Sequence, residues 1–209
     1  MSGSRQRIAA NERIFPGMIG YTLFETNIGW AGLAWADKGL VGVHLPEPTP
    51  ETARRSFLRR YPDAVEAAPT PIIEAAVAGI RELLAGEPNA LLDVPIDIAR
   101  VPDFNARVYE IARAIPPGET LTYGEIAVKL GDKLLARDVG AALGQNPWPI
   151  VVPCHRVTAA GGKLGGFSAR GGVNTKLKLL AIEGARVLEP APAKPPRAKA
   201  PNAQPSLFD

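Results

Sequence analysis

The residues best suited to chemistry lie together in the segment Pro153-Cys154-His155-Arg156-Val157, which follows the apolar run from Pro149 to Val152. Cys154 is the only cysteine of the chain, and His155 is one of its two histidines. A cysteine is nucleophilic as its thiolate, and a neighbouring base and a positive charge both favour that form. The segment is therefore a candidate reactive thiol, although a lone cysteine after two valines is by type most often a small buried hydrophobic residue.

Length and composition bound the class of protein. The chain has 209 residues, of which 46% are apolar, and this is enough for one large or two small globular domains. Its net charge of +3 permits nucleic-acid binding without requiring it. A single cysteine excludes an internal disulfide and a multi-cysteine zinc site, and we expect no metal. No apolar stretch approaches the roughly 20 residues of a membrane span, and residues 1–11 lack a secretory signal, so we expect a cytoplasmic protein without membrane contact.

The first half of the chain is typical of a small α+β unit. Apolar patterning predicts strands at 21–24, 28–36 and 40–43, joined into an antiparallel sheet with a hairpin turn at 37–39. Helical spacing predicts helices at 51–61 and 71–84, and residues 92–98 could add a further strand. His44 lies within a predicted strand, so we expect a structural role for it, and this half shows no catalytic constellation.

The second half is predicted to be mainly helical, with helices at 104–115, 123–130 and 135–145. Thr122 can cap the second helix, and the turn at 131–133 suggests helix-turn-helix geometry. The third helix is rich in small residues, namely Ala136, Gly140, Ala141, Ala142 and Gly144. Because a helical glycine costs roughly 1 kcal/mol against alanine, such a surface indicates close approach of a partner or tight packing in the core. The sequence pattern leaves both open.

Taken in order, these segments resemble the 6-O-alkylguanine-DNA alkyltransferase family, also called methylated-DNA-protein-cysteine methyltransferases. The matching pieces are Ile115-Pro116-Pro117-Gly118, Thr122-Tyr123-Gly124, Ala136-Arg137, Asn146-Pro147, Pro153-Cys154-His155-Arg156-Val157, Gly165-Gly166-Phe167-Ser168 and Lys176 to Gly184. The close match covers about 104–184. The resemblance implies an α+β fold with a ribonuclease-H-like antiparallel-sheet domain over 20–100 and a mainly helical, winged-helix-like domain with a helix-turn-helix over 101–187. From their composition we expect a flexible start over 1–19 and a disordered tail over 188–209.

The resemblance implies a single-turnover DNA repair enzyme that needs no cofactor. Cys154 would take the alkyl group from 6-O-alkylguanine, with 4-O-alkylthymine as a second candidate substrate, and would remain alkylated. His155, reached through a water and oriented by Glu183, would accept the thiol proton. Tyr123 would donate a proton or hydrogen bond to the purine leaving group, and Asn146 would brace the turn that holds the cysteine.

The resemblance also implies how the substrate base is held. Ser168 would face the alkylated oxygen, and the backbone carbonyls of Cys154 and Val157 would read the exocyclic amine. Phe167 stands where many relatives have tyrosine, so an apolar wall remains but a hydroxyl is lost. We therefore expect activity with an altered substrate tolerance.

Binding to double-stranded DNA is implied for the third helix. Because a duplex hides the alkyl group, the nucleotide must be flipped out, and Arg137 matches the arginine that takes its place in the stack. Asp138 adds a negative charge beside it, which is unfavourable near phosphate. The surface that would enter the minor groove comprises Ala136, Arg137, Gly140, Ala141 and Gly144. We expect a monomer associated with the nucleoid.

Two other classes of protein remain open. A recognition-only protein of the alkyltransferase-like class would bind the lesion without accepting the alkyl group, but such proteins lack the cysteine that is present here as Cys154. A thiol hydrolase would need an oxyanion hole and turnover, and no motif in the chain requires either.

The end of the chain carries a separate motif. Residues 190–205 are rich in proline, alanine and lysine without apolar periodicity, so we expect disorder there. The following residues resemble the short peptide with which bacterial DNA-processing proteins bind the replicative sliding clamp, with Gln204, Leu207 and Phe208 as the contact residues. A chance apolar end is the alternative.

A peptide spanning residues 200–209 is expected to bind a bacterial sliding clamp in isothermal titration calorimetry. Leu207→Ala and Phe208→Ala should abolish the binding heat, because these two side chains would fill an apolar pocket of the clamp. The absence of detectable binding at high micromolar clamp concentration would refute the clamp hypothesis.

Overall fold

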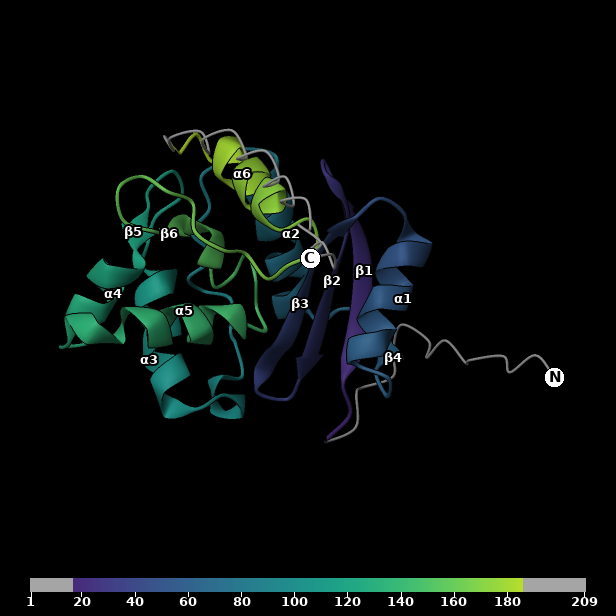
Figure 1. Cartoon of the computed structure of the whole chain (residues 1–209). Helices are drawn as coiled ribbons and strands as arrows, with labels where there is room; N and C mark the ends of the chain where they lie inside the picture. Colours follow the sequence, from purple (N-terminus) through teal and green to yellow (C-terminus); the bar gives the residue numbers. More distant parts are fainter. Residues whose placement is uncertain (1–16, 186–209) are drawn as a thin grey trace, which may run out of the picture.

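The computed structural model describes residues 17–185, in which a sheet-based first half and a mainly helical second half pack against each other (Figure 1). Most of the predicted flexible start at 1–19 lies outside the described residues, as do the predicted disordered tail and its clamp-like residues Gln204, Leu207 and Phe208. Within residues 17–185, no helix combines the length and apolar character needed to cross a membrane.

A four-stranded sheet in the order β3-β2-β1-β4 forms the first half. The strands β1 (Gly20–Thr26), β2 (Gly29–Ala36) and β3 (Gly39–Glu47) form the predicted antiparallel meander. The short β4 (Val65–Glu66) pairs parallel with β1, so the sheet is mixed, and the expectation of a purely antiparallel sheet was wrong. Two residues are too few to show an alternating pattern in the sequence.

The two predicted helices of the first half are confirmed and cover opposite faces of the sheet (Figure 1). The helix α1 (Pro50–Arg60) packs Phe57 against Tyr21 and Val41. The helix α2 (Pro71–Leu84) belongs to the other apolar cluster, which contains Phe24, Leu33, Ile73 and Ile80. Because side chains alternate along a strand, the same three strands supply both clusters.

The strand suggested at 92–98 is wrong. This stretch makes a single bridge between Leu40 and Ile96 and then enters a 3-10 turn, η1 (Ile98–Arg100). The Leu40 N–H donates to the Pro95 carbonyl at 2.8 Å, and the Asp97 N–H donates to the Leu40 carbonyl at 2.9 Å. Pro95 has no N–H to donate, so a ladder could not run through this position.

The predicted helices of the second half are confirmed as α3 (Asp103–Arg113), α4 (Tyr123–Lys129) and α5 (Ala136–Gly144). Thr122 caps α4 as expected, in a reciprocal arrangement with Glu125. The turn η2 (Lys133–Leu135) precedes α5. Two-residue strands β5 (Leu121–Thr122) and β6 (Val157–Thr158) pair in parallel, and α6 (Val173–Ile182) completes the half.

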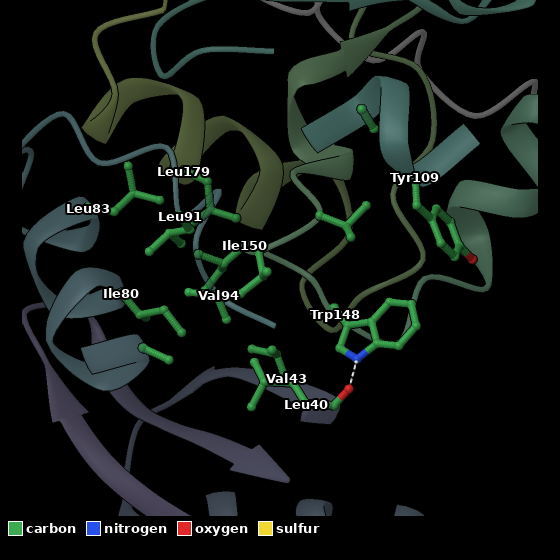
Figure 2. Packing of buried hydrophobic residues seen from close by; sticks show 14 of the residues in the cluster. Leu40, Val43, Ile80, Leu83, Leu91, Val94, Tyr109, Trp148, Ile150 and Leu179 are labelled. Carbon is green, nitrogen blue, oxygen red and sulfur yellow. Dashed lines mark hydrogen bonds between the residues drawn. The ribbon is translucent and has the colours of Figure 1, made fainter. Parts of the chain in front are cut away.

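Trp148 joins the two halves (Figure 2). Its indole N–H donates to the Leu40 carbonyl at 2.7 Å, and its ring meets Tyr109 of α3 edge to face at 6.0 Å. Next to it, the Val43 N–H donates to the Pro147 carbonyl at 2.9 Å. The edge strand β3 is therefore covered by the segment that leads to Cys154, and this contact fixes the segment against the sheet.

Replacing Trp148 with phenylalanine is expected to lower the free energy of unfolding by about 1–3 kcal/mol, because a buried hydrogen bond and part of a buried ring are lost. The Leu40 carbonyl keeps its bond from Asp97, so the variant should still fold. Urea denaturation followed by circular dichroism should show one transition for both proteins. Trp30→Phe, on a partly exposed β2 ring, is the control, and an equal loss in both variants would contradict this role for Trp148.

Candidate active site

Glu183, directly after α6, is a buried carboxylate that binds two neighbours of Cys154. Its Oε1 lies 2.9 Å from His155 Nε2, and Arg156 donates from Nε to Oε2 and from Nη2 to Oε1, both at 2.8 Å. Arg156 also donates from Nη1 to the Ile115 carbonyl at 2.6 Å. Burial alone would raise the pKa of Glu183, but the bonds from His155 and Arg156 outweigh it and lower the pKa to about 2.

His155 is kept neutral by burial, and the Glu183 carboxylate fixes the orientation of its ring. Burial lowers the pKa of His155, and the hydrogen bond that His155 donates to Glu183 only partly opposes that effect. An ionised carboxylate can only accept, so Nε2 carries the proton and the lone pair is on Nδ1. Among residues 17–185, Nδ1 has no hydrogen-bond partner although it is buried. The side chain next to Cys154 therefore offers an unused proton acceptor.

Cys154 begins the short turn η3 (Cys154–Arg156) and is half-buried. Burial raises the pKa of its thiol, while a hydrogen bond from Asn146 and the charge of Lys176 act in the opposite direction. A thiol with a raised pKa is protonated at neutral pH and needs a base to become a nucleophile. The geometry of the neighbouring imidazole meets that need.

Asn146 spans the turn that precedes Cys154. Its Nδ2 donates to the Val152 carbonyl at 2.8 Å, and its Oδ1 accepts the Trp148 N–H at 2.9 Å. Within this turn Ile150 has a φ of +78°, a conformation that is costly for a β-branched residue. The two bonds of the asparagine and the burial of Ile150 hold the turn in this conformation.

Lys176 is a buried cation for which the sequence analysis gave no separate role. It has no exposed surface, and its Nζ donates to the carbonyls of Val157 and Leu164, the latter at 2.7 Å. Burial lowers its pKa to about 8, against the opposing effect of Cys154. The bond to Val157 uses one lone pair of the carbonyl that was predicted to read the exocyclic amine, which leaves the other lone pair.

The sequence carried a signal that Lys176 and Glu183 are buried. Lys176, Leu179, Leu180 and Glu183 follow one another at i, i+3, i+4 and i+7, so two charges lie within an apolar stripe of α6. A charged residue on a buried face requires a partner of opposite charge or a set of hydrogen bonds. Arg156, two residues after the cysteine, is the partner that Glu183 requires.

The structure brings the predicted catalytic residues Cys154 and Tyr123 and the predicted substrate-binding residues Phe167 and Ser168 to one pocket of about 480 Å³. Gly140, Leu143, Gly144 and Gly166 complete its lining. The Tyr123 hydroxyl donates to the Gly166 carbonyl at 3.4 Å, and burial raises its pKa, so it is protonated at neutral pH. Ser168 Oγ donates to the Gly144 carbonyl at 3.1 Å and ties the pocket wall to α5.

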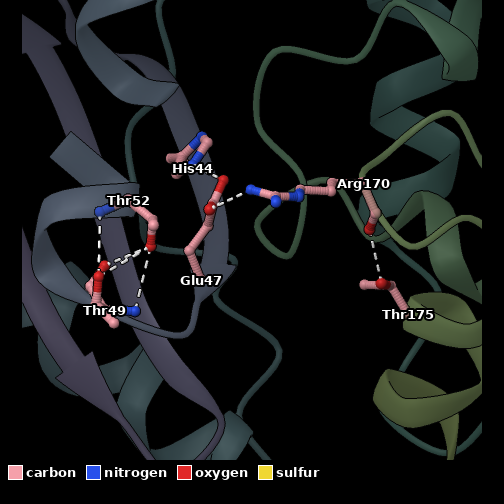
Figure 3. Close-up of polar contacts among 6 residues, drawn as sticks. All are labelled: His44, Glu47, Thr49, Thr52, Arg170 and Thr175. Atoms are coloured by element: carbon pink, nitrogen blue, oxygen red, sulfur yellow. Dashed lines mark hydrogen bonds and ion pairs between the residues drawn. The ribbon is translucent and has the colours of Figure 1, made fainter. Parts of the chain in front are cut away.

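The loop that carries Phe167 and Ser168 is also tied to the first half (Figure 3). Arg170 Nη1 donates to Glu47 Oε2 at 2.6 Å, and the other oxygen of Glu47 lies 3.3 Å from His44 Nε2. Thr175 Oγ1 donates to the Arg170 carbonyl at 2.7 Å. His44 thus has the structural partner that was expected of it. Nothing in the sequence pattern marks the contact between Arg170 and Glu47.

The outer face of α5 carries Arg137, Asp138, Ala141 and Gly144, all exposed, while Val139 and Leu143 are buried beneath them. A Cβ added at Gly144 would meet no atom within 4 Å, and one added at Gly140 would touch only the Tyr123 ring at 3.9 Å. Packing inside the protein therefore does not require these glycines, which favours the alternative that a partner approaches closely. Arg137 makes no ion pair with any residue between 17 and 185.

The fold and the site define an α+β protein in which a half-buried cysteine lines a pocket and is followed by a histidine that pairs with a buried glutamate. Residues 103–185 match the family model described as 6-O-methylguanine DNA methyltransferase, DNA binding domain. The chain is 39% identical over 170 residues to a methylated-DNA-protein-cysteine methyltransferase of Mycobacterium tuberculosis, covering 81% of this chain and 94% of the relative. The chain belongs to the methylated-DNA-protein-cysteine methyltransferase family.

Other relatives agree with this assignment. The chain is 37% identical over 154 residues to a DNA base-flipping protein of Thermus thermophilus, covering 74% of this chain and 95% of the relative. It is also similar to the crystal structure of Mycobacterium tuberculosis OGT in complex with DNA, with a TM-score of 0.61, 36% identity, and coverage of 78% of this chain and 92% of that chain.

The substitution Glu183→Gln is expected to destabilise the protein by about 3–5 kcal/mol at neutral pH, because it leaves the buried Arg156 without its counter-charge. The folded-state pKa of Glu183 lies below the ordinary value of 4.5. Its ionisation therefore stabilises the folded state above about pH 4.5, and this contribution is lost as the pH falls toward 2.

Denaturation experiments between pH 7 and pH 3 test this dependence. The unfolding free energy of the unchanged protein should fall more steeply below pH 5 than that of Glu183→Gln. Glu110→Gln, at an exposed position of α3, is the matched control and should follow the unchanged protein. Parallel curves for all three proteins would rule out the proposed pairing.

Proposed function

We propose that this protein repairs DNA by transferring the alkyl group of 6-O-alkylguanine to Cys154, once per molecule. The observation that carries this proposal is the position of Cys154, which lines a pocket with Tyr123 and Ser168 and precedes a buried histidine with a free acceptor nitrogen. Membership in the methyltransferase family supports the same reaction. The residues present supply the base, the nucleophile and the donor, and the reaction requires no cofactor.

The first step is removal of the thiol proton. His155 Nδ1 accepts it through a water, and the resulting imidazolium is paired with Glu183 through Nε2. With its pKa near 2, Glu183 stays ionised throughout, so the proton remains on the imidazole. The ammonium of Lys176 adds a positive charge that favours the thiolate. The raised pKa of Cys154 keeps the resting thiol protonated until the base acts.

The second step is displacement at the alkyl carbon. A sulfur lone pair forms the new carbon-sulfur bond while the carbon-oxygen bond breaks, and the electron pair of that bond passes to the guanine. The Tyr123 hydroxyl, protonated at neutral pH, donates a hydrogen bond or proton to the departing purine. The products are unmodified guanine and a thioether at Cys154. Ser168 would face the alkylated oxygen, and the carbonyls of Cys154 and Val157 would bind the exocyclic amine.

The third element of the proposal is access to the base. The outer face of α5, with its small residues, would lie in the minor groove of the duplex, and Arg137 would fill the space left by the flipped nucleotide. The strands β5 and β6 beside the helices support a winged-helix-like description of the second half, and the mixed sheet with flanking helices supports a ribonuclease-H-like first half. We propose a monomer that acts on chromosomal DNA in the cytoplasm.

Incubation with a duplex carrying one 6-O-methylguanine is expected to add the mass of one methylene group to the protein, in a stoichiometric amount and at Cys154. Intact-protein mass spectrometry with peptide mapping measures this, and Cys154→Ala should gain nothing. A second duplex with 4-O-methylthymine tests the other candidate substrate. Tight binding to the lesion without a gain in mass would replace the proposal with the recognition-only alternative, and repeated turnover of simple esters would favour a hydrolase.

A further inference from the structure

An open groove of about 640 Å³ lies between the two halves and is continuous with the substrate pocket, with which it shares Cys154, Phe167 and Ser168. The edge strand β3 and the end of α1 form one side, and the loop with Arg170 and the end of α5 form the other. Its charged and polar lining consists of His44, Glu47, Ser56, Arg59, Arg60, Gln145, Asn146, Cys154, Ser168, Arg170 and Thr175. We call it the arginine groove, after Arg59, Arg60 and Arg170.

The charge of the groove is positive. Glu47 is the single acid of its lining, and the ion pair with Arg170 neutralises it. Arg59 and Arg60 are exposed in the last turn of α1 and form no ion pair with any residue in the described range 17–185. Burial is the largest cause of the lowered pKa of His44, and the positive charges of Arg59 and Arg60 lower it further. The electric field of both arginines therefore reaches the side of the groove formed by β3.

The groove continues the outer face of α5. Arg137, Ala141, Gly144 and Gln145 are exposed at helical spacing, and the last two also line the groove. At 1.5 Å per residue, the seven steps from Arg137 to Gly144 cover roughly 10 Å, about three base pairs at 3.4 Å each. A duplex that lies along α5 therefore reaches the groove within a few base pairs of Arg137.

We propose that Arg59 and Arg60 bind backbone phosphates of the DNA that extends past the end of α5. The first half of the chain then contributes directly to DNA affinity, in addition to supporting the active site. An open, positively charged groove suits a phosphodiester backbone, because arginine binds phosphate oxygens with several N–H donors and the affinity requires no base contact. The inference rests on the proposed function in one respect, namely that the ligand of α5 is duplex DNA.

Salt dependence of binding to an unmodified duplex tests this inference without any alkyl transfer. Affinity measured by fluorescence anisotropy should fall linearly on a plot of log affinity against log salt concentration. The steepness of this line should decrease by about 0.9 for each phosphate contact removed. Arg59→Ala and Arg60→Ala should each show that decrease. In the variant that combines both substitutions, the ratio of the affinity of the unchanged protein to that of the variant should fall roughly tenfold between 50 and 200 mM salt.

Three comparisons make the result specific. Arg55→Ala removes the same charge from an exposed position of α1 that does not line the groove, and it should leave the slope unchanged. Arg59→Lys keeps the positive charge, so its salt dependence should be close to that of the unchanged protein and steeper than that of Arg59→Ala. A further comparison uses duplexes that carry one lesion and are shortened to about three base pairs on one side of it. Shortening one of the two sides should abolish the difference in affinity between the unchanged protein and the groove variants, and shortening the other side should not.

An unchanged slope in both groove variants would overturn the inference, and so would an equal decrease in Arg55→Ala. Transfer to Cys154, measured by mass on the unchanged protein, reports separately on the proposed function. If the unchanged protein shows no transfer but both groove variants show the expected smaller slope, the repair activity alone is refuted. If transfer occurs but the slope of both groove variants equals that of the unchanged protein, the role of the arginine groove alone is refuted.

Discussion

The buried carboxylate of Glu183 is the contact on which the site depends. It accepts hydrogen bonds from His155 and Arg156, which follow Cys154 directly, and so it fixes the turn η3 against the end of α6. A buried charge is tolerated only when its partners are well placed, so the position of the cysteine and the ionisation of the carboxylate depend on each other. The same bonds select the histidine tautomer whose acceptor nitrogen, Nδ1, has no hydrogen-bond partner within residues 17–185.

Burial and pairing set the acid-base character of the whole site. Burial raises the pKa of Cys154 and lowers the pKa of His155, so both are neutral at rest. Burial also lowers the pKa of Lys176 to about 8, which still leaves it largely charged at neutral pH. A thiol in such surroundings is unreactive until a neighbouring base takes its proton, which protects a protein that can use its cysteine only once. The arrangement thus favours selectivity over general thiol reactivity.

The first half of the chain positions this site through two different contacts. Trp148 binds the edge strand β3 just before the turn that holds Cys154, and Arg170 binds Glu47 just after the loop segment with Phe167 and Ser168. Since the segments on both sides of the pocket are attached to the same strand, the sheet acts as a rigid support for the pocket. The arginine groove lies on that support, between the sheet and the end of α5.

The sequence alone determined most of the helices and strands and the residue types of the candidate site. Capping by Thr122, the helical apolar spacing of α2 and the cysteine-histidine pair each depend on residues close in the chain, which is why local patterns predicted them. Only the tertiary structure showed that Arg156 binds Glu183 and that Lys176 binds the Val157 carbonyl, added β4 to the sheet and replaced the strand expected at 92–98 with a single bridge. These features depend on partners distant in sequence, since a buried charge or a two-residue strand is stable only beside a partner that no local pattern identifies.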